Sequence, residues 1–330
     1  MNQPRRTSRR AFVVGTAAAS VLAVAPVSAQ QYPTRPVRII IGFAAGGPTD
    51  VIARLLAAEL TNRFGQSFVV ENRPGANSMI ATDQVMRAAP DGYTLIATTL
   101  AHNINRILAP DKARYDPIKD FTPISLVATV PMIAVTGYNT PIKSIAEVVA
   151  MARAKPGEVN YGSAGHGGSA HLAGAALAVQ SNTEMTHIPF KGNAPALTEV
   201  IAGRVTFMFY PMVGIAERVA QKQLKALGVS TAQRHPDFPD VPTMSELGFP
   251  GFEENSPGLP YLAPAGTPPA IIARLSEAMR EVVDKPSFQE RLRGLGAVPV
   301  GSSPEQLAGW LKTDYERWDR LIKAAKIQPE

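Results

Sequence analysis

Short apolar runs alternate along the chain with stretches whose apolar residues recur at helical spacing. Residues 37–41 form such a run, which breaks at Gly42, and a helical pattern at 51–60 follows at once. Further runs at 68–71 and 94–98 flank a second helical stretch near 78–88. Strands that alternate with helices at this spacing are typical of α/β domains with a parallel, doubly wound sheet.

The middle of the chain shows the same alternation. Its predicted elements, in chain order, are helix 144–154, strand 159–161, helix 170–179, strand 187–190, helix 195–202, strand 205–210 and strand 224–229. A strand-like stretch at 124–135 and a Pro- and Gly-rich stretch at 251–264 flank this set, and we interpret both as crossings. The pattern predicts two α/β lobes joined by a hinge: residues 32–130 with 255–330, and residues 131–254. Ligands of open α/β sheets bind at the carboxyl ends of the strands.

The last third of the chain is predicted to be mainly helical. Helices are expected from 267 to 283, from 286 to 295 and onward from Ser303. Trp310, Tyr315 and Trp318 recur at helical spacing in the final helix, which favours packing of this helix against the first lobe.

Residues 1–29 have the features of an export signal. They hold four arginines and no acidic residue, then a small-residue apolar run, and they end in Val27-Ser-Ala29. Arg9-Arg10 before Ala11-Phe12 resembles a twin-arginine address, with the general export route as the alternative. The other alternative is an uncleaved anchor, because the apolar run is nearly long enough to cross a bilayer. We expect cleavage and a periplasmic protein.

Removal of this leader changes the charge of the chain. The formal net charge of +6 loses four arginines and falls to about +2, so the composition gives no support for nucleic-acid binding. The chain has no cysteine, which excludes disulfides, thiol catalysis and thiolate metal sites. Its length suffices for two domains with large cores.

Glycine-rich turns precede four of the predicted helices. They lie at 43–50, 74–78, 161–171 and 190–196, two in each predicted lobe. A helix start presents unpaired N–H groups and the positive end of the helix dipole, which suits a carboxylate or phosphate. Several such starts around one cleft predict a small organic carboxylate as the ligand. The alternative is a set of ordinary connections with no ligand.

Other chemistry is weakly supported by the sequence. There is no Walker phosphate loop, 161–171 does not fit G-x-G-x-x-G, and Tyr161 occupies the position where a nucleophile elbow needs glycine. The five histidines are scattered in the sequence, so no metal site and no cofactor are expected. A serine hydrolase that uses Ser163 or Ser169 with His171 remains as an alternative.

Nine short motifs in order resemble the Bug family of periplasmic solute-binding receptors, which serve tripartite tricarboxylate transporters. The resemblance spans residue 32 to about residue 318. The motifs are 32–38 (Tyr-Pro-Thr-Arg-Pro-Val-Arg), Gly46-Gly-Pro-Thr-Asp50, Val70-Glu-Asn-Arg-Pro-Gly-Ala76, Pro90-Asp-Gly-Tyr-Thr-Leu95, Asp116-Pro-Ile-Lys-Asp-Phe-Thr-Pro123, Tyr161-Gly-Ser-Ala-Gly165, Pro189-Phe-Lys-Gly192, Asp240-Val-Pro-Thr243 and Ala263-Pro-Ala-Gly-Thr-Pro268.

The resemblance implies a non-enzymatic protein with the type II, Venus-flytrap fold of periplasmic binding proteins. It also implies a carboxylate held partly by main-chain N–H groups, and delivery to two integral membrane transporter subunits. A receptor that signals to a sensor kinase is the alternative. A monomer is the default expectation. By position, the implied ligand contacts are Phe43, Ala45, Gly46, Gly47, Asp50, Asn77, Ser78, Thr98, Ser163, Gly165, Ser169, His171, Lys191 and Asn193.

Two departures from the family pattern concern the cleft. The strand at 205–210 lacks the acidic residue that the family usually has, and Ser256-Pro257 stands where a tryptophan is common. Phe209 and Tyr210 are therefore expected to let the cleft admit a larger or aromatic acid.

Overall fold

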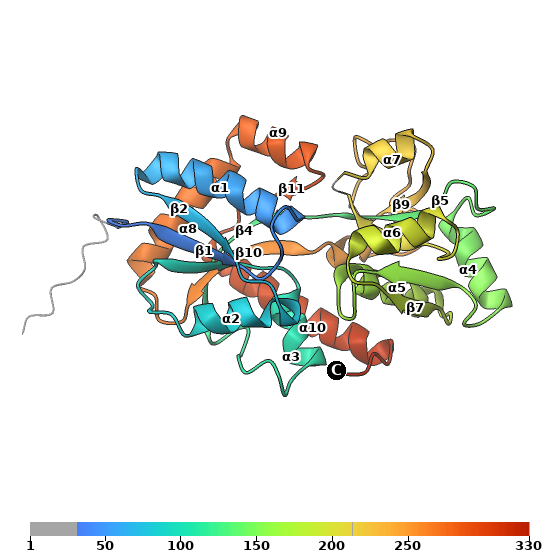
Figure 1. The fold of residues 1–330 in the computed structure, drawn as a ribbon, viewed down its shortest axis with the longest axis horizontal. Coiled ribbons are helices and arrows are strands. Elements are labelled where there is room, and N and C mark those ends of the chain that lie inside the picture. Colours follow the sequence, from blue (N-terminus) through green and yellow to red (C-terminus); the bar gives the residue numbers. More distant parts are fainter. Residues whose placement is uncertain (1–31, 213, 330) are drawn as a thin grey trace, which may run out of the picture.

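The computed structural model describes residues 32–212 and 214–329, so the predicted export signal at 1–29 lies outside the described residues. Figure 1 shows two α/β bodies side by side. They are joined by β4 (Phe121–Thr129), which leads into β5 (Met132–Gly137), and by β10 (Gly258–Pro264). The predicted two-lobe α/β architecture is confirmed. Within the described part of the chain, no helix has the length and apolar character that a bilayer crossing requires.

The first body is built on a six-stranded sheet with the order β11-β4-β10-β3-β1-β2. The strands β2, β1 and β3 are parallel, whereas β10 is antiparallel to both β3 and β4. The sheet is therefore mixed, because the crossing strands return from the other lobe. Its remaining elements are β1 (Val37–Ile41), α1 (Pro48–Phe64), β2 (Phe68–Asn72), η2 (Ala76–Ser78), α2 (Met79–Met86), β3 (Thr94–Ala97), α3 (Ala101–Leu108), α8 (Pro269–Val283), α9 (Pro286–Gly294), β11 (Val298–Pro299) and α10 (Pro304–Ala324).

The second body divides its strands between two small sheets, β8-β5-β9 and β6-β7. The strand β5 is antiparallel to both its neighbours, whereas β6 and β7 are parallel. Its elements are α4 (Ile145–Ala154), β6 (Asn160–Ser163), α5 (Ser169–Ser181), β7 (Thr186–Pro189), α6 (Asn193–Ile201), β8 (Met208–Pro211), α7 (Ala216–Ala220), β9 (Leu224–Val229) and η3 (Phe252–Asn255). The lobe boundaries given above stay a prediction.

Side chains cap the starts of two described helices. In α10, Ser303 and Gln306 form a complete capping box. At α4 the Ser144 hydroxyl accepts the Glu147 N–H, and the Glu147 carboxylate accepts from the N–H of Lys143 at 2.6 Å. The Glu147 carboxylate thus satisfies the backbone N–H of the residue before the N-cap Ser144.

The helix α3 was not predicted, and it brings α10 into contact with both lobes. Leu100, Ile104 and Leu108 of the α3 segment form a buried cluster with Trp318, Ile322 and Leu172 of α5. Trp318 thus packs on the first lobe, as the sequence predicted, and also contacts Leu172 of the second lobe, which the sequence did not predict. Figure 1 shows α10 running from the first body toward the second.

His102 of α3 should make the stability of the protein depend on pH. It is fully buried, its Nε2 lies 2.8 Å from the carbonyl oxygen of Pro117, and burial lowers its pKa to about 4. In the unfolded chain it gains a proton near pH 6.5. Between these two values the unfolded state binds more protons, so the free energy of unfolding falls as the pH is lowered. We expect a contribution of up to about 1.4 kcal/mol per pH unit.

Urea unfolding of His102→Gln and of the unsubstituted protein, from pH 8 to pH 4, measures this contribution. At pH 8 the histidine is neutral in both states, so the difference there reports the packing loss alone. The variant is expected to show the shallower dependence below pH 6.5. Equal slopes would show that His102 does not titrate on unfolding.

Candidate functional site

A cavity of about 1140 Å³ lies between the two bodies. Its walls include residues at or beside the starts of α1, η2, α3, α5 and α6, and residues of the crossing segments also line it. The residues that line it are Gly42, Phe43, Ala44, Gly47, Pro48, Thr49, Pro74, Gly75, Ala76, Asn77, Thr99, Leu100, Ala101, Val130, Ala164, Gly165, His166, Gly167, Gly168, Ser169, Ala170, Lys191, Asn193, Pro211, Pro257 and Leu259. Five helix starts thus face one space, one more than the sequence predicted.

Asp50 organises the glycine loop on the first-lobe wall. Its buried carboxylate accepts from the Gly46 N–H at 2.9 Å, from Asn72 Nδ2 at 2.9 Å and from the Arg54 guanidinium. Burial raises the pKa of Asp50, but these hydrogen bonds together lower it by more than burial raises it. The pKa of Asp50 therefore lies below its ordinary value. The carboxylate is therefore ionised and fully engaged, and it shapes the loop instead of lining the cavity.

The turn before α2 is a strained part of the first-lobe wall. Ala76, Asn77 and Ser78 follow one another with φ values of 47°, 48° and 74°, in the left-handed region that non-glycine residues rarely adopt. Asn77 Nδ2 donates to Asn105 Oδ1 of α3 at 2.9 Å, and Asn105 Nδ2 donates to the Asn77 carbonyl at 2.8 Å. Such strain clusters at ligand-binding sites, where the surrounding structure maintains it.

Two buried hydroxyls beside the cavity have no hydrogen-bond partner among the described residues. They are Ser78 Oγ and Thr98 Oγ1, both on residues that are nearly inaccessible to solvent. Neither residue lines the cavity, although Asn77 and Thr99 do. A buried hydroxyl without a partner carries a desolvation cost, so each of these two hydroxyls destabilises the wall locally.

The second-lobe wall is the loop between β6 and α5. The Ser163 hydroxyl accepts the Gly165 N–H at 3.1 Å and donates to the Gly165 carbonyl at 2.9 Å. Gly165 has φ +140° and Gly167 has φ +67°. A Cβ on Gly167 would lie 2.9 Å from Leu108 of α3, so this glycine permits the loop to touch the first lobe.

Positive charge in the cavity is limited. Among the described lining residues, Lys191 is the single lysine or arginine, and it stands just before α6. Asn193 is the first residue of that helix. The cavity therefore combines helix starts with one side-chain cation.

The structure brings half of the predicted contact residues to the cavity. Those that line it are Phe43, Gly47, Asn77, Gly165, Ser169, Lys191 and Asn193. Ala45 and Gly46 belong to the same loop as the lining residues Ala44 and Gly47, and Asp50 lies beneath it. Ser78 and Thr98 are each next in sequence to a lining residue. Ser163 hydrogen-bonds within the second-lobe loop. His171 lines another cavity, on the other side of that loop.

The hypothesis that Phe209 and Tyr210 enlarge the cleft is wrong. Phe209 is fully buried in the second-lobe core, where it stacks on Phe252 with ring centroids 5.1 Å apart, and neither residue lines the cavity. Sequence reasoning instead missed Thr99, Leu100 and Ala101, which follow β3. The spacing of Leu100, Ile104 and Leu108 is the signal that could have predicted this helix start.

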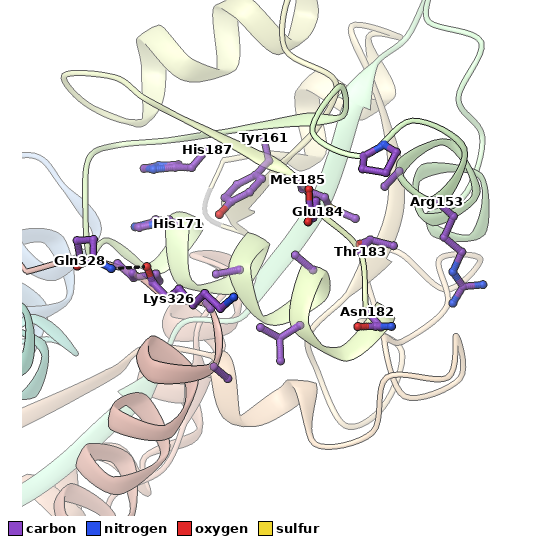
Figure 2. A pocket seen from close by; sticks show the side chains of 18 of the residues that line it. Arg153, Tyr161, His171, Asn182, Thr183, Glu184, Met185, His187, Lys326 and Gln328 are labelled. Atoms are coloured by element: carbon purple, nitrogen blue, oxygen red, sulfur yellow. Dashed lines mark hydrogen bonds between the residues drawn. The ribbon is translucent and has the colours of Figure 1, made fainter.

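The interpretation of the histidines as scattered is wrong for three of the five. His166, His171 and His187 come together because β7 pairs with β6 in register, with His187 opposite Tyr161, while α5 starts just after β6. Figure 2 shows His171 and His187 one above the other. They line a second cavity, of about 820 Å³, together with residues near the carboxyl terminus.

The proposed serine–histidine pairing also differs. Ser163 Oγ lies 2.6 Å from Nε2 of His187, whereas His171 Nδ1 accepts the Gly167 N–H at 3.0 Å. Ser163 and His171 therefore form no nucleophile–base pair. In the described part of the chain, no carboxylate orients either imidazole in the way that a catalytic triad requires.

Comparison with known proteins agrees with this architecture. Residues 52–327 match the family model described as the tripartite tricarboxylate transporter family receptor. The chain is 35% identical to protein BugT of Bordetella pertussis over 318 residues, which cover 96% of this chain and 97% of BugT. It is 34% identical to R. palustris Rpa4515, solved with adipate, with a TM-score of 0.81 over 91% of this chain and 100% of that one.

A further solved relative is MatC from Rhodopseudomonas palustris with bound malate. It is 34% identical, with a TM-score of 0.76 over 88% of this chain and 100% of that chain. By family model, sequence and fold together, the chain belongs to the family of tripartite tricarboxylate transporter receptors, which are solute-binding proteins and not enzymes.

Proposed function

We propose that this protein is a periplasmic receptor that holds a small organic carboxylate in the interlobe cavity and delivers it to the two integral membrane subunits of a tripartite tricarboxylate-type transporter. The convergence of five helix starts on one cavity carries this proposal. Helix starts bind anions through backbone N–H groups and the helix dipole. The relatives solved with adipate and with malate support the same ligand class.

The predicted contacts divide into two groups by their surroundings. We assign direct contact with the ligand to the lining residues Phe43, Gly47, Asn77, Gly165, Ser169, Lys191 and Asn193. We assign a supporting role to Asp50 and Ser163, whose side chains hold the two glycine loops in shape. Preorganised loops lower the entropic cost of binding, which is the benefit of such support.

The cavity connects ligand binding to hinge motion. We propose that residues 32–130 with 255–330, and residues 131–254, close as two bodies around the ligand, in a protein that acts as a monomer after its leader is removed. The ligand stabilises the closed form by its higher affinity for that form alone. Val130 and Pro257, which line the cavity, lie in the two crossings where this motion would occur.

A thermal-shift screen against mono-, di- and tricarboxylates, amino acids and aromatic acids tests the ligand class. A ligand present at about 100 times its dissociation constant adds roughly 2.7 kcal/mol of stability, which gives a clear shift. A shift limited to carboxylates supports the proposal, and the failure of every acid to shift the melting temperature would overturn it.

Lys191→Ala should weaken the binding of the carboxylate found in that screen by roughly 10- to 100-fold. A hydrogen bond to a charged group contributes about 1.5–3 kcal/mol, and the cavity lining offers one lysine for it. Isothermal titration calorimetry measures the change. The matched control is Lys155→Ala, which removes an exposed lysine paired with Glu158 and outside the cavity lining. Equal affinities for the two variants would remove Lys191 from the contact set.

A further inference from the structure

Three histidines from different elements of the second lobe converge beside the loop that separates the interlobe cavity from the second cavity, and His166 lines both. His166 lies in the loop before α5, His171 in the first turns of α5, and His187 in β7. One ligand nitrogen from each lies within 4.8 Å of the other two. A tetrahedral ion with bonds of about 2.0–2.1 Å to nitrogen needs ligand separations of roughly 3.3 Å, so the side chains must rotate to close the cluster.

Hydrogen bonds already set two of the imidazoles in the form that a metal needs. His166 Nε2 lies 3.1 Å from the carbonyl oxygen of Gln328, which can only accept, so Nε2 carries the proton and Nδ1 is free. The Ser163 hydroxyl donates to Gly165, so it accepts the proton of His187 Nε2 at 2.6 Å and leaves Nδ1 of that ring free. Metal-bound histidines generally donate their other N–H to an oxygen in this way.

His171 needs a larger adjustment. Its ring stacks on that of His187, with centroids 3.7 Å apart and planes at 7°, and its Nδ1 accepts the Gly167 N–H. The lone pair of an imidazole nitrogen lies in the ring plane, so an ion shared by two stacked rings requires the rings to tilt. Coordination through His171 Nδ1 also displaces the Gly167 N–H from that nitrogen.

The second cavity offers access and room for a further ligand. It measures about 820 Å³, and Figure 2 shows His171 and His187 on its wall near Lys326 and Gln328. The donor set is wholly imidazole, which suits Zn²⁺, Cu²⁺ and Ni²⁺ and does not suit Mg²⁺ or Ca²⁺.

We propose that His166, His171 and His187 bind one divalent transition-metal ion of the Zn²⁺, Ni²⁺ or Cu²⁺ class, with water as the remaining ligand. The ion would fix the loop 164–168, which lines the interlobe cavity on its other side, against α5 and β7. The site adjoins the carboxylate contacts through His166 and Ser163, but it does not depend on the proposed function.

Calorimetric titration with Zn²⁺, Ni²⁺ or Cu²⁺ tests the site, in the purified protein without a polyhistidine tag and in a buffer free of carboxylates. We expect one ion per chain. His166→Gln and His187→Gln should each weaken binding by more than roughly 100-fold, and Ser163→Ala, which removes an outer-shell partner, by roughly 10- to 100-fold. Co²⁺ should give the visible absorption of a four-coordinate nitrogen-rich site.

His235→Gln is the matched control, because it removes a histidine that lies outside the cluster and should leave the titration unchanged. Circular dichroism confirms that each variant is folded, and the half-buried His166 in a loop is the substitution that should disturb folding least. Absence of binding at millimolar ion, or equal affinity in all variants, would overturn the proposal.

Discussion

Gly42→Ala is expected to weaken carboxylate binding by roughly 100-fold and to lower the free energy of unfolding by about 3 kcal/mol. A Cβ at this position would lie 1.9 Å from Ser78 Oγ and 2.6 Å from Ser78 Cα, so the backbone of the 75–78 turn must move. Overpacking of this kind costs about 1–3 kcal/mol, and a displacement of about 1 Å in a preorganised site costs roughly 100-fold. Urea unfolding and calorimetry measure the two effects.

Gly309→Ala is the control, since it makes the same substitution at a helical position of α10 outside the cavity lining. Its Cβ would meet no heavy atom within 4 Å. We expect stability within about 1 kcal/mol of the original and retained binding. If Gly42→Ala bound carboxylate as well as this control, the close approach of β1 and the turn would not be needed for the site.

Trp318→Ala is expected to lower the free energy of unfolding by about 3–5 kcal/mol and to open the ligand-free protein. Trp318 is fully buried between α3 of the first lobe and Leu172 of the second, and its Nε1 donates to the buried Asp314 carboxylate at 2.8 Å. Removal leaves a cavity and takes one donor from a buried charge. Urea unfolding reports the stability, and small-angle scattering reports the radius of gyration, which should rise.

The other tryptophan of the chain provides the control. Trp310 lies on the same helix, but it packs against Gly258 and against a first-lobe cluster that includes Leu126, Leu307 and Leu311. Trp310→Ala should lower stability without changing the radius of gyration. An unchanged radius in Trp318→Ala would show that the cluster stabilises the protein without connecting the lobes.

Local patterns predicted most elements of the fold, and the reasons are visible in single residues. The strand at 37–41, its break at Gly42 and the helix after Pro48 follow from apolar period, turn chemistry and a proline at a first helical position. The helix α3 was not predicted because it has no glycine stop and no side-chain cap, and its N-cap position is Leu100. Its buried face is recognisable only from the spacing of three apolar residues.

The sequence indicated which loops line the candidate site, but not which of their side chains face it. Resemblance and glycine turns indicated segments that line the interlobe cavity, since a helix start presents its N–H groups whatever its neighbours are. Asp50 and Ser163 belong to these segments, yet their polar atoms hydrogen-bond within the loops. Which atom faces a ligand depends on partners distant in sequence, such as Asn72 for Asp50 and His187 for Ser163.

The sequence by itself determined the alternation of strands and helices, the helix starts that suit an anion and the family to which the chain belongs. These features depend on residues that are neighbours along the chain. Only the tertiary structure decided that His187 lies over His171, that Trp318 joins α3 to α5, and that five helix starts enclose one cavity. Such contacts depend on strand order and on the crossings between lobes, which bring together residues far apart in sequence and leave no local periodic signal.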